Sequence, residues 1–357
     1  MPNHQYGLIM AGGRGTRFWP RSRRRNAKQV LRFFGERTLI QQTVDRLKGV
    51  IPPENVWVIT NDFLQAEIRK QLPQVPKEQI IAEPSQRNTA PCVALAAQIL
   101  AEIDPEAVMG VFPADHLILR AARFRSFVES AFRSAEGGGV VILGIQPRWP
   151  ETGYGYIEFP KSVRPGAREA IPIASFREKP DSETAKKFVK RGNFFWNAGM
   201  FFWRASTVLD LLRRHQPKTA ALLAGLPSFR SKGFMAKLRT AYPLCDDISV
   251  DYALIEKAKG ILGIAADDIG WNDVGSWDAV YELGAKDGDR NASRGELFAN
   301  ESHGNYVDAD KVVALIGVDD LIVVDTPDAL LIANRSKAQD VSKLVKTLET
   351  QKRDDLL

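Results

Sequence analysis

The sequence predicts an α/β protein with a doubly wound, mostly parallel sheet, followed by a small unit of β structure. In the first half of the chain, short β-branched runs alternate with segments of helical periodicity, which is typical of a parallel sheet covered by helices on both faces. The chain has 357 residues, 44% of them hydrophobic, and can bury a large core. After Asn291 the apolar runs become short, with aspartates and glycines between them.

The large domain is expected to span residues 1–290. Its first half should contain strands at residues 6–10, 56–60 and 108–112 and helices at residues 39–48, 63–72 and 89–103. Its second half should contain strands at 140–145, 153–160, 171–176 and 194–203, a helix at 181–190, and mostly helical structure from 205 to 259. All of these elements can form one doubly wound domain.

The small unit is expected at residues 291–357. Three short apolar runs, at residues 312–316, 321–324 and 330–333, indicate strands. The tail then carries apolar residues at helical spacing, which are Val341, Leu344, Val345 and Leu348. Such a stripe must be buried, either on this chain or on a partner.

Composition limits the classes of function. The 49 basic and 43 acidic residues leave a net charge of +6, which is too small at this length to indicate nucleic-acid binding by itself. Two cysteines, Cys92 and Cys245, cannot build a disulfide framework, and the four histidines lack the spacing of metal ligands. No signal-peptide pattern and no membrane-spanning apolar run are evident. We therefore expect a cytoplasmic protein with no membrane contact and no nucleic-acid partner.

A glycine-rich loop follows the first predicted strand. It reads Ala11-Gly12-Gly13-Arg14-Gly15-Thr16-Arg17. Glycines at the carboxyl end of a strand let backbone N–H groups approach an anion, although a tight strand-to-helix turn would also use them. A dinucleotide fingerprint would place a third glycine where Phe18 stands, and a Walker A loop would end in Lys-Ser or Lys-Thr. The loop therefore differs from both of these known phosphate-binding loops.

A basic segment continues from this loop. Between Arg14 and Arg32 there are eight basic residues and no acidic one. A run of this kind is often a solvated face, and a nucleic-acid-binding module is a further alternative. Next to a glycine loop, however, the pattern favours a nucleoside triphosphate held by backbone amides and by cations such as Lys28.

The loop carries a family resemblance. The run Ala-Gly-Gly-Arg-Gly-Thr-Arg-Phe-Trp-Pro, with Ser22-Arg23 and Lys28-Gln29 after it, resembles the signature of mannose-1-phosphate guanylyltransferases (GDP-mannose pyrophosphorylases), which are sugar nucleotidyltransferases. The resemblance continues to the C-terminus. It implies that Arg14, Arg17 and Lys28 meet the triphosphate as catalytic cations. The nucleotide would lie against Ala11, Gly12, Gly13, Gly15 and Thr16.

The resemblance also implies a nucleotide-diphospho-sugar transferase fold, with a C-terminal unit like a β-helix. One position departs from the family pattern, because Ala27 stands where a proline usually precedes the lysine.

A second segment resembles the guanine-binding stretch of the family. It reads Glu83-Pro84-Ser85-Gln86-Arg87-Asn88-Thr89-Ala90-Pro91. By itself this segment is a helix entry capped by Asn88 or Thr89. The resemblance implies that Glu83 accepts from the N–H groups of guanine and that Asn88, Thr89 and Ala90 complete the pocket.

Two aspartates are candidate metal ligands. Asp115, in Pro113-Ala114-Asp115-His116, should follow a buried strand, where a carboxylate can hold Mg²⁺ together with phosphate oxygens. The motif resembles the metal-binding Pro-Ala-Asp-His of the family. Asp273, in Trp271-Asn272-Asp273-Val274-Gly275, resembles its second metal motif, although an Asx turn would explain it as well.

Three further segments resemble the sugar site of the family. They contain Tyr154 and Gly155, Glu178 and Lys179, and Asn197. Asn197 and Glu178 can donate to and accept from adjacent sugar hydroxyls, and Lys179 can meet a 1-phosphate. Taken singly, Glu178 and Lys179 would be a surface ion pair and Asn197 a turn residue.

The resemblance therefore implies transfer of GMP from GTP to mannose 1-phosphate, with Mg²⁺, in a homodimer formed through residues 291–357. Another nucleoside triphosphate or another hexose 1-phosphate stays open as the substrate. An NAD-dependent oxidoreductase and a nucleic-acid-binding module are alternatives from other classes.

Overall fold

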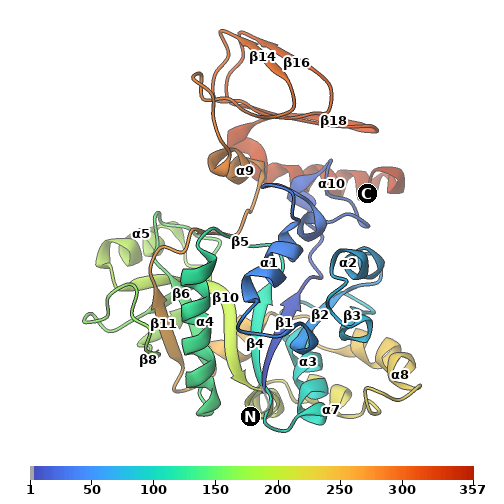
Figure 1. Cartoon of the computed structure of the whole chain (residues 1–357), viewed down its shortest axis with the longest axis vertical. Coiled ribbons are helices and arrows are strands. Elements are labelled where there is room, and N and C mark those ends of the chain that lie inside the picture. The colour runs from blue at the N-terminus through green and yellow to red at the C-terminus, as the bar shows by residue number, and fades with distance from the viewer. Residues whose placement is uncertain (1–3) are drawn as a thin grey trace.

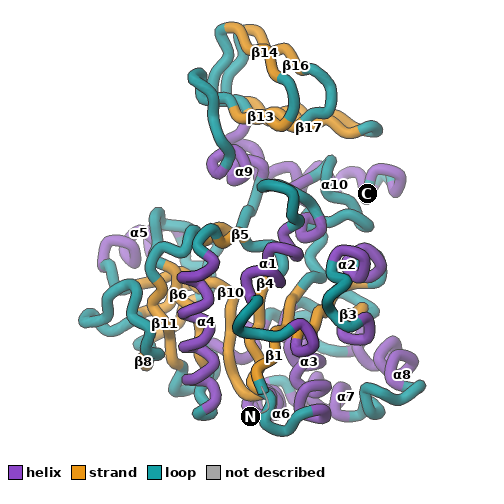
Figure 2. Tube along the Cα trace, in the orientation of Figure 1, coloured by secondary structure: helices purple, strands orange, loops and turns teal. Residues whose placement is uncertain are grey.

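The computed structural model describes residues 4–357. Its main sheet contains the strands β1 (Gln5–Met10), β2 (Val56–Asn61), β3 (Ile80–Glu83), β4 (Val108–Pro113), β6 (Val141–Ile145), β8 (Ile171–Pro172), β10 (Phe194–Arg204) and β11 (Leu262–Ala266). They lie in the order β3-β2-β1-β4-β10-β6-β11-β8 (Figures 1 and 2). Two short strands, β7 (Tyr156–Glu158) and β9 (Ser175–Arg177), extend the sheet beside β10.

The sheet is parallel in the half that contains β1 to β4. β1 runs parallel to β2 and to β4, and β2 runs parallel to β3. β10, which the chain reaches from β9 through the helix α5 (Ser182–Arg191), is antiparallel to β4, to β6 and to β7. The carboxyl ends of β1, β3 and β4 therefore meet at one edge of the sheet.

Helices cover both faces of the sheet, as the sequence predicts. Buried side chains of α1 (Leu39–Leu47), α2 (Gln65–Gln71) and α4 (Ala121–Glu136) form one core with one face. A second core on the opposite face takes α3 (Thr89–Ile103), α6 (Ala205–His215), α7 (Pro217–Ala224) and α8 (Phe234–Ala241). The expected doubly wound domain is confirmed. No helix within residues 4–357 is long and apolar enough to span a bilayer.

The C-terminal unit is β-helix-like, also as expected. Its strands are β13 (Ala292–Arg294), β14 (Leu297–Asn300), β15 (Tyr306–Asp308), β16 (Val313–Ile316), β17 (Leu321–Thr326) and β18 (Ala329–Asn334). β13, β15 and β17 form parallel neighbours, β18 closes that sheet in antiparallel register, and β14 pairs in parallel with β16. Successive turns of the chain thus stack on one another (Figure 1).

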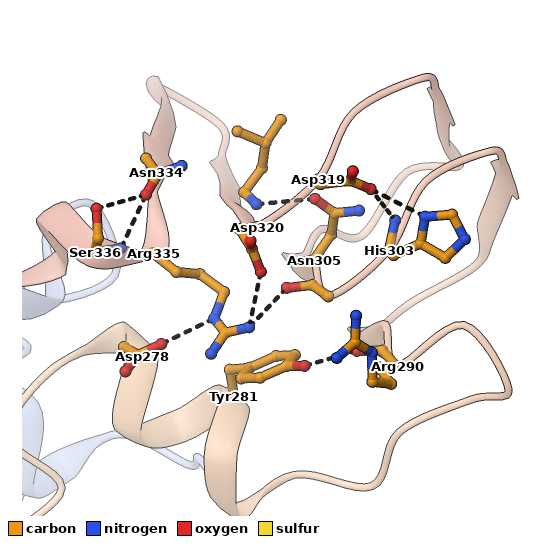
Figure 3. Close-up of polar contacts among 12 residues, drawn as sticks. Asp278, Tyr281, Arg290, His303, Asn305, Asp319, Asp320, Asn334, Arg335 and Ser336 are labelled. Carbon is orange, nitrogen blue, oxygen red and sulfur yellow. Dashed lines mark hydrogen bonds and ion pairs between the residues drawn. The ribbon is translucent and has the colours of Figure 1, made fainter.

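One arginine, Arg335, makes several polar contacts between the C-terminal unit and helix α9 (Trp277–Leu283) (Figure 3). Arg335 Nε donates to Asp278 Oδ1 at 2.8 Å, and its Nη1 donates to the backbone oxygen of Gly304 at 3.0 Å. The same guanidinium lies 3.4 Å from the ring centroid of Tyr281. The planar guanidinium therefore pairs with a carboxylate, donates to a backbone oxygen and stacks on an aromatic ring at the same time. These contacts attach the C-terminal unit to the large domain.

The apolar stripe of the tail is buried on this chain. Helix α10 (Val341–Thr350) places Val341, Val345 and Leu348 in a cluster with Trp19 and with other aromatic residues from both units. Leu344 is the exception and is exposed. The C-terminal helix therefore packs directly on the segment that follows the glycine loop.

Candidate active site

A cavity of about 630 Å³ opens at the edge where β1, β3 and β4 end. Twelve of the residues proposed from the sequence line it: Gly12, Gly13, Glu83, Asn88, Thr89, Asp115, Tyr154, Gly155, Glu178, Lys179, Asn197 and Asp273. They come from segments that lie far apart along the chain, so the fold assembles the site from regions that are distant in sequence. A smaller cavity of about 210 Å³ is lined by Gly15, Thr16, Arg17 and Lys28 and shares Asp115 and Asp273 with the first.

Two glycines of the loop lie in close contact with other residues of the site. A Cβ on Gly12 would lie 2.5 Å from Glu83 Oε1, and a Cβ on Gly15, whose φ is 61°, would lie 2.7 Å from Lys28 Cβ. The positive φ and the tight contact favour glycine at position 15, and a side chain at position 12 would have to displace the Glu83 carboxylate. Ala11 is buried, and its N–H donates to Ile59 O at 2.8 Å, so it holds the loop on the sheet without lining either cavity.

Lys28 lines the smaller cavity, where the sequence predicts the phosphates. Its Nζ donates to Asp115 Oδ2 at 2.8 Å and also to the backbone oxygen of Asp273. Burial raises the pKa of the Asp115 carboxyl, but the nearby ammonium outweighs burial, so this pKa falls below its ordinary value. Ala27 has a φ of −74°, close to the angle that a proline ring imposes. The backbone ahead of Lys28 therefore keeps the conformation that the family's proline would give.

The two candidate metal ligands are both held by neighbours. The Tyr154 hydroxyl donates to Asp273 Oδ1 at 2.5 Å, and burial beside this carboxylate raises the pKa of Tyr154, which keeps the hydroxyl protonated. The carboxylates of Asp115 and Asp273 border the same two cavities. Within residues 4–357, no three His, Cys, Asp or Glu side chains gather as a complete metal cage. A hard cation held by two carboxylates and by substrate phosphates fits this donor set.

His116 is a residue that the sequence did not single out as part of the site. The Trp271 indole donates to His116 Nδ1 at 3.2 Å, and Arg46 donates to its backbone oxygen at 2.7 Å. Burial lowers the pKa of His116 to about 4, so the ring is neutral. Since the indole can only donate, the proton of the neutral ring is on Nε2. Both cavities are lined by this ring.

The predicted base end is built on β3 and on the start of α3. Glu83 ends β3, and the Tyr242 hydroxyl donates to its Oε2 at 2.7 Å. Burial raises the pKa of Glu83 to about 7. Asn88, at a φ of 60°, caps α3 through Thr89 N–H, and Thr89 Oγ1 accepts from Val250 N–H at 2.8 Å. Ala90 is buried, and it fixes the start of the helix from behind the cavity.

The predicted sugar end contains an acid, Asp251, that the sequence did not reveal. Asn197 Nδ2 donates to Asp251 Oδ1 at 2.8 Å. Glu178, with its side chain 8% exposed, has its pKa raised to about 7 by burial and by the charge of Asp251, while Lys179 Nζ lies 3.6 Å from Glu178 Oε1. Asp251 begins a π-helical turn within a region of plain helical periodicity, so no local motif marks it.

Arg14 is placed differently from the other two predicted cations. Its guanidinium pairs with Glu349 of α10, and it lines a third cavity of about 400 Å³ beside Gly13 and Glu83. Arg17 instead faces the smaller cavity, where it donates to Gly275 O at 2.7 Å. The structure thus brings Arg17 and Lys28 to the candidate metal ligands, and it holds Arg14 against the C-terminal helix.

Other members of the basic run also pair with the C-terminal unit. Arg21 donates two hydrogen bonds to the Asp308 carboxylate, at 2.6 and 3.1 Å. Arg23 pairs with Asp328 at 3.0 Å, and Arg24 pairs with Asp354 at 2.7 Å. These pairs join opposite ends of the sequence. Part of the basic segment is therefore neutralised by acidic residues of its own chain.

Comparison with known proteins agrees with this geometry. Residues 6–290 match the nucleotidyl transferase family, and residues 295–348 match the MannoseP isomerase/GMP-like beta-helix domain. The chain is 39% identical to the mannose-1-phosphate guanylyltransferase of Escherichia coli, over 98% of this chain and 74% of that one. It is 37% identical to the alginate biosynthesis protein AlgA of Pseudomonas aeruginosa, over 98% of this chain and 73% of that one.

A solved structure covers almost the whole chain. The crystal structure of mannose-1-phosphate geranyltransferase from Thermus thermophilus matches with a TM-score of 0.85 at 32% identity, over 97% of this chain and 100% of that one. These relatives cover both units of the chain. The chain belongs to the mannose-1-phosphate guanylyltransferase family of nucleotidyl transferases.

Proposed function

We propose that this protein transfers GMP from GTP to mannose 1-phosphate, giving GDP-mannose and pyrophosphate. The observation that carries the proposal is one continuous site with three chemically distinct parts. Glu83, a buried acceptor, and polar groups that suit a hexose line the main cavity, while Lys28 lines the smaller cavity and contacts Asp115, which borders both. A nucleotide and a sugar phosphate can therefore meet at the cation.

The proposed reaction is an in-line displacement at phosphorus. An oxygen of mannose 1-phosphate forms a bond to the α-phosphorus of GTP, and the bond from that phosphorus to the β-bridging oxygen breaks, which releases pyrophosphate. The attacking oxygen is already anionic at neutral pH, so no general base is required. The task of the protein is to position two polyanions and to offset their repulsion, which Lys28 and Arg17 can do.

The family of nucleotidyl transferases generally uses a divalent metal ion, and we propose that it is Mg²⁺ here. Asp115 and Asp273 would hold it. When bound there, it would neutralise charge on the phosphate oxygens. Lys28 and Tyr154 orient these two carboxylates through hydrogen bonds of 2.8 and 2.5 Å. Each aspartate therefore keeps a fixed direction before any substrate arrives.

The two ends of the cavity would select the substrates. At the base end, Glu83 would accept from guanine, with Asn88 and Thr89 beside it. At the sugar end, Asn197 and Glu178 would bind hydroxyls. Their pairing with Asp251 and with Lys179, respectively, supports this role, because it fixes which atoms stay free for a ligand. Lys179 would meet the 1-phosphate.

We also propose a homodimer that forms through the C-terminal unit. Several apolar side chains on its strands are exposed: Ile316 of β16 is 74% exposed and Ile332 of β18 is 61% exposed, and Phe298 and Leu330 in the same unit are also exposed. Large exposed apolar side chains on regular strands are candidates for an interface. A second copy of this chain would cover them.

A reducing setting such as the cytoplasm suits the proposed enzyme. Cys92 and Cys245 are free and buried. Burial raises the pKa of both thiols, to about 11 for Cys245, so neither is a reactive thiolate near neutral pH.

The experiment that tests the function is direct product detection. The protein is incubated with GTP, mannose 1-phosphate and Mg²⁺, and the mixture is resolved by anion-exchange chromatography. GDP-mannose and pyrophosphate should form in equal amounts. The absence of both products would refute the proposal.

A further inference from the structure

The Glu83 carboxylate, at the base end, accepts a hydrogen bond from a hydroxyl that is remote in sequence. The Tyr242 hydroxyl donates to Glu83 Oε2 at 2.7 Å across 159 positions. Tyr242 is 0% exposed, and Glu83 is 7% exposed. We propose that Tyr242 is a positioning residue that presents Glu83 to guanine and thereby helps the enzyme to select GTP. This inference rests on the proposed function.

The geometry leaves one carboxylate oxygen for a ligand. Oε2 is occupied by the tyrosine, whereas Oε1 lies over the glycine loop, 2.5 Å from where a Cβ of Gly12 would be. Among the hydrogen bonds of residues 4–357, none reaches Oε1. Because Glu83 lines the main cavity, this oxygen is available there to a donor. The tyrosine sets the plane of the carboxylate, and Gly12 leaves room for it.

The segment around Tyr242 is anchored to the same stretch as Glu83. Arg87 donates to Pro243 O, Ala90 N–H donates to Ile248 O at 3.1 Å, and Val250 N–H donates to Thr89 Oγ1. Residues 242–250 therefore form a backing layer behind the base-binding stretch. The hydroxyl is directed at Glu83 by backbone that is fixed at several points.

The chemistry of guanine explains why such support matters. Guanine offers two adjacent donors, N1–H and the exocyclic amino group, which an ionised carboxylate accepts, whereas adenine offers an acceptor at N1. Burial raises the pKa of Glu83, and the hydrogen bond from Tyr242 counteracts this rise. Burial raises the pKa of Tyr242 well above its ordinary value, so the phenol stays a donor. Removing the hydroxyl should leave a carboxyl that protonates more easily and rotates more freely.

The test compares two triphosphates that differ by one donor. ITP keeps N1–H but lacks the exocyclic amino group of GTP. In Tyr242→Phe, the ratio of kcat/KM for GTP to that for ITP should fall by about tenfold, as expected when a charge-assisted hydrogen bond is weakened. The acidic limb of the pH profile of kcat/KM for GTP should also move to higher pH.

A control and a second variant separate this role from a structural one. Tyr281→Phe removes another buried hydroxyl, which donates to Arg290 O at 2.9 Å far from the base end, and it should change neither readout. On a Glu83→Gln background, Tyr242→Phe should add little further loss of GTP preference.

An equal loss for GTP and ITP in Tyr242→Phe, or an unchanged ratio and pH profile, would overturn the inference. A wild-type protein without GDP-mannose synthesis would refute the proposed function instead.

Discussion

The Lys28 ammonium bridges Asp115 Oδ2 and the backbone oxygen of Asp273, and so it joins the two loops that carry the candidate metal carboxylates. One buried cation thus serves both the order of the site and its charge balance. Asp115 is kept ionised by this contact despite its burial, because the contact lowers its pKa. The position of Lys28 therefore makes it the residue whose removal is most informative about catalysis.

Lys28→Ala should lower kcat by roughly 100-fold or more, because a preorganised cation stabilises most strongly the state in which phosphate charge develops. GTP affinity should fall less than kcat. The measurement is steady-state kinetics together with a direct GTP binding titration. Lys48→Ala, which removes an exposed lysine paired with Asp45, is the control. A loss of affinity with an unchanged kcat would show that Lys28 only binds.

Asp115→Asn and Asp273→Asn should each weaken Mg²⁺ binding and lower the activity. The fold loss of activity in the double variant should be much smaller than the product of the two single fold losses. Residues that act on one shared ion are non-additive in this way. Activity is measured across a Mg²⁺ titration, with circular dichroism to confirm the fold. Additive losses at saturating Mg²⁺ would mean that Asp273 is only a turn residue.

Glu178→Gln should stabilise the folded protein above neutral pH. The pKa of the Glu178 carboxyl is about 7 in the folded chain and 4.5 ordinarily, so the folded state binds the extra proton between these values and wild-type stability falls as pH rises through this window. The gain should approach about 3 kcal/mol at pH 8 and vanish below the ordinary pKa.

Urea unfolding of Glu178→Gln and wild type, at about pH 4 and about pH 8, measures this gain. Glu183→Gln, an exposed position on α5, should show no such gain. An equal effect of Glu178→Gln at both pH values would contradict the explanation by burial.

The ion pairs between the basic run and the C-terminal unit should differ in strength according to burial. Arg21→Ala leaves Asp308, 5% exposed, without its bidentate partner, which should cost about 3 kcal/mol. Arg24→Ala breaks the exposed pair with Asp354 and should cost less than about 1 kcal/mol. Thermal unfolding of both variants measures the difference, and equal losses would count against the buried contact.

The proposed homodimer is best tested by surface charge. Deletion from Asn291 onward would also remove the ion-pair partners of Arg21 and Arg23, so a change in size would have two causes. Ile316→Lys with Ile332→Lys should instead give a monomer by light scattering, since two buried charges oppose association. Leu119→Lys, at an exposed apolar position in the large domain, is the control. An intact dimer in the double variant would place the interface elsewhere.

Much of the fold could be predicted from local patterns. Helix α3 begins and ends where the sequence predicts, because Asn88 caps its start. The direction of β10 could not be predicted, since a buried apolar run reads the same in either direction and its antiparallel pairing depends on β4 and β6. Strand β11 and helix α4 were not among the predicted elements.

The residues of the candidate site also fall into two groups, those that the sequence predicts and those that it does not. Residues carried by short motifs, such as Asp115 and Glu83, were proposed from the sequence, and the structure brings them to one cavity. Tyr242 and Asp251 lie in helical stretches without a motif, and their contacts reach 159 and 54 positions along the chain. The pairing of Arg14 with Glu349 likewise joins opposite ends of the sequence. Such contacts depend on the assembled fold.

The most direct test of the proposed activity is a matrix of pyrophosphate-release assays, with each common nucleoside triphosphate against each common hexose 1-phosphate in the presence of Mg²⁺. GTP with mannose 1-phosphate should give the highest kcat/KM, and replacing either substrate should lower it by about tenfold or more, since sites built on hydrogen bonds reject analogues that leave polar groups unpaired. Pyrophosphate release from no pair, or a higher kcat/KM with a different triphosphate or sugar phosphate, would contradict the account.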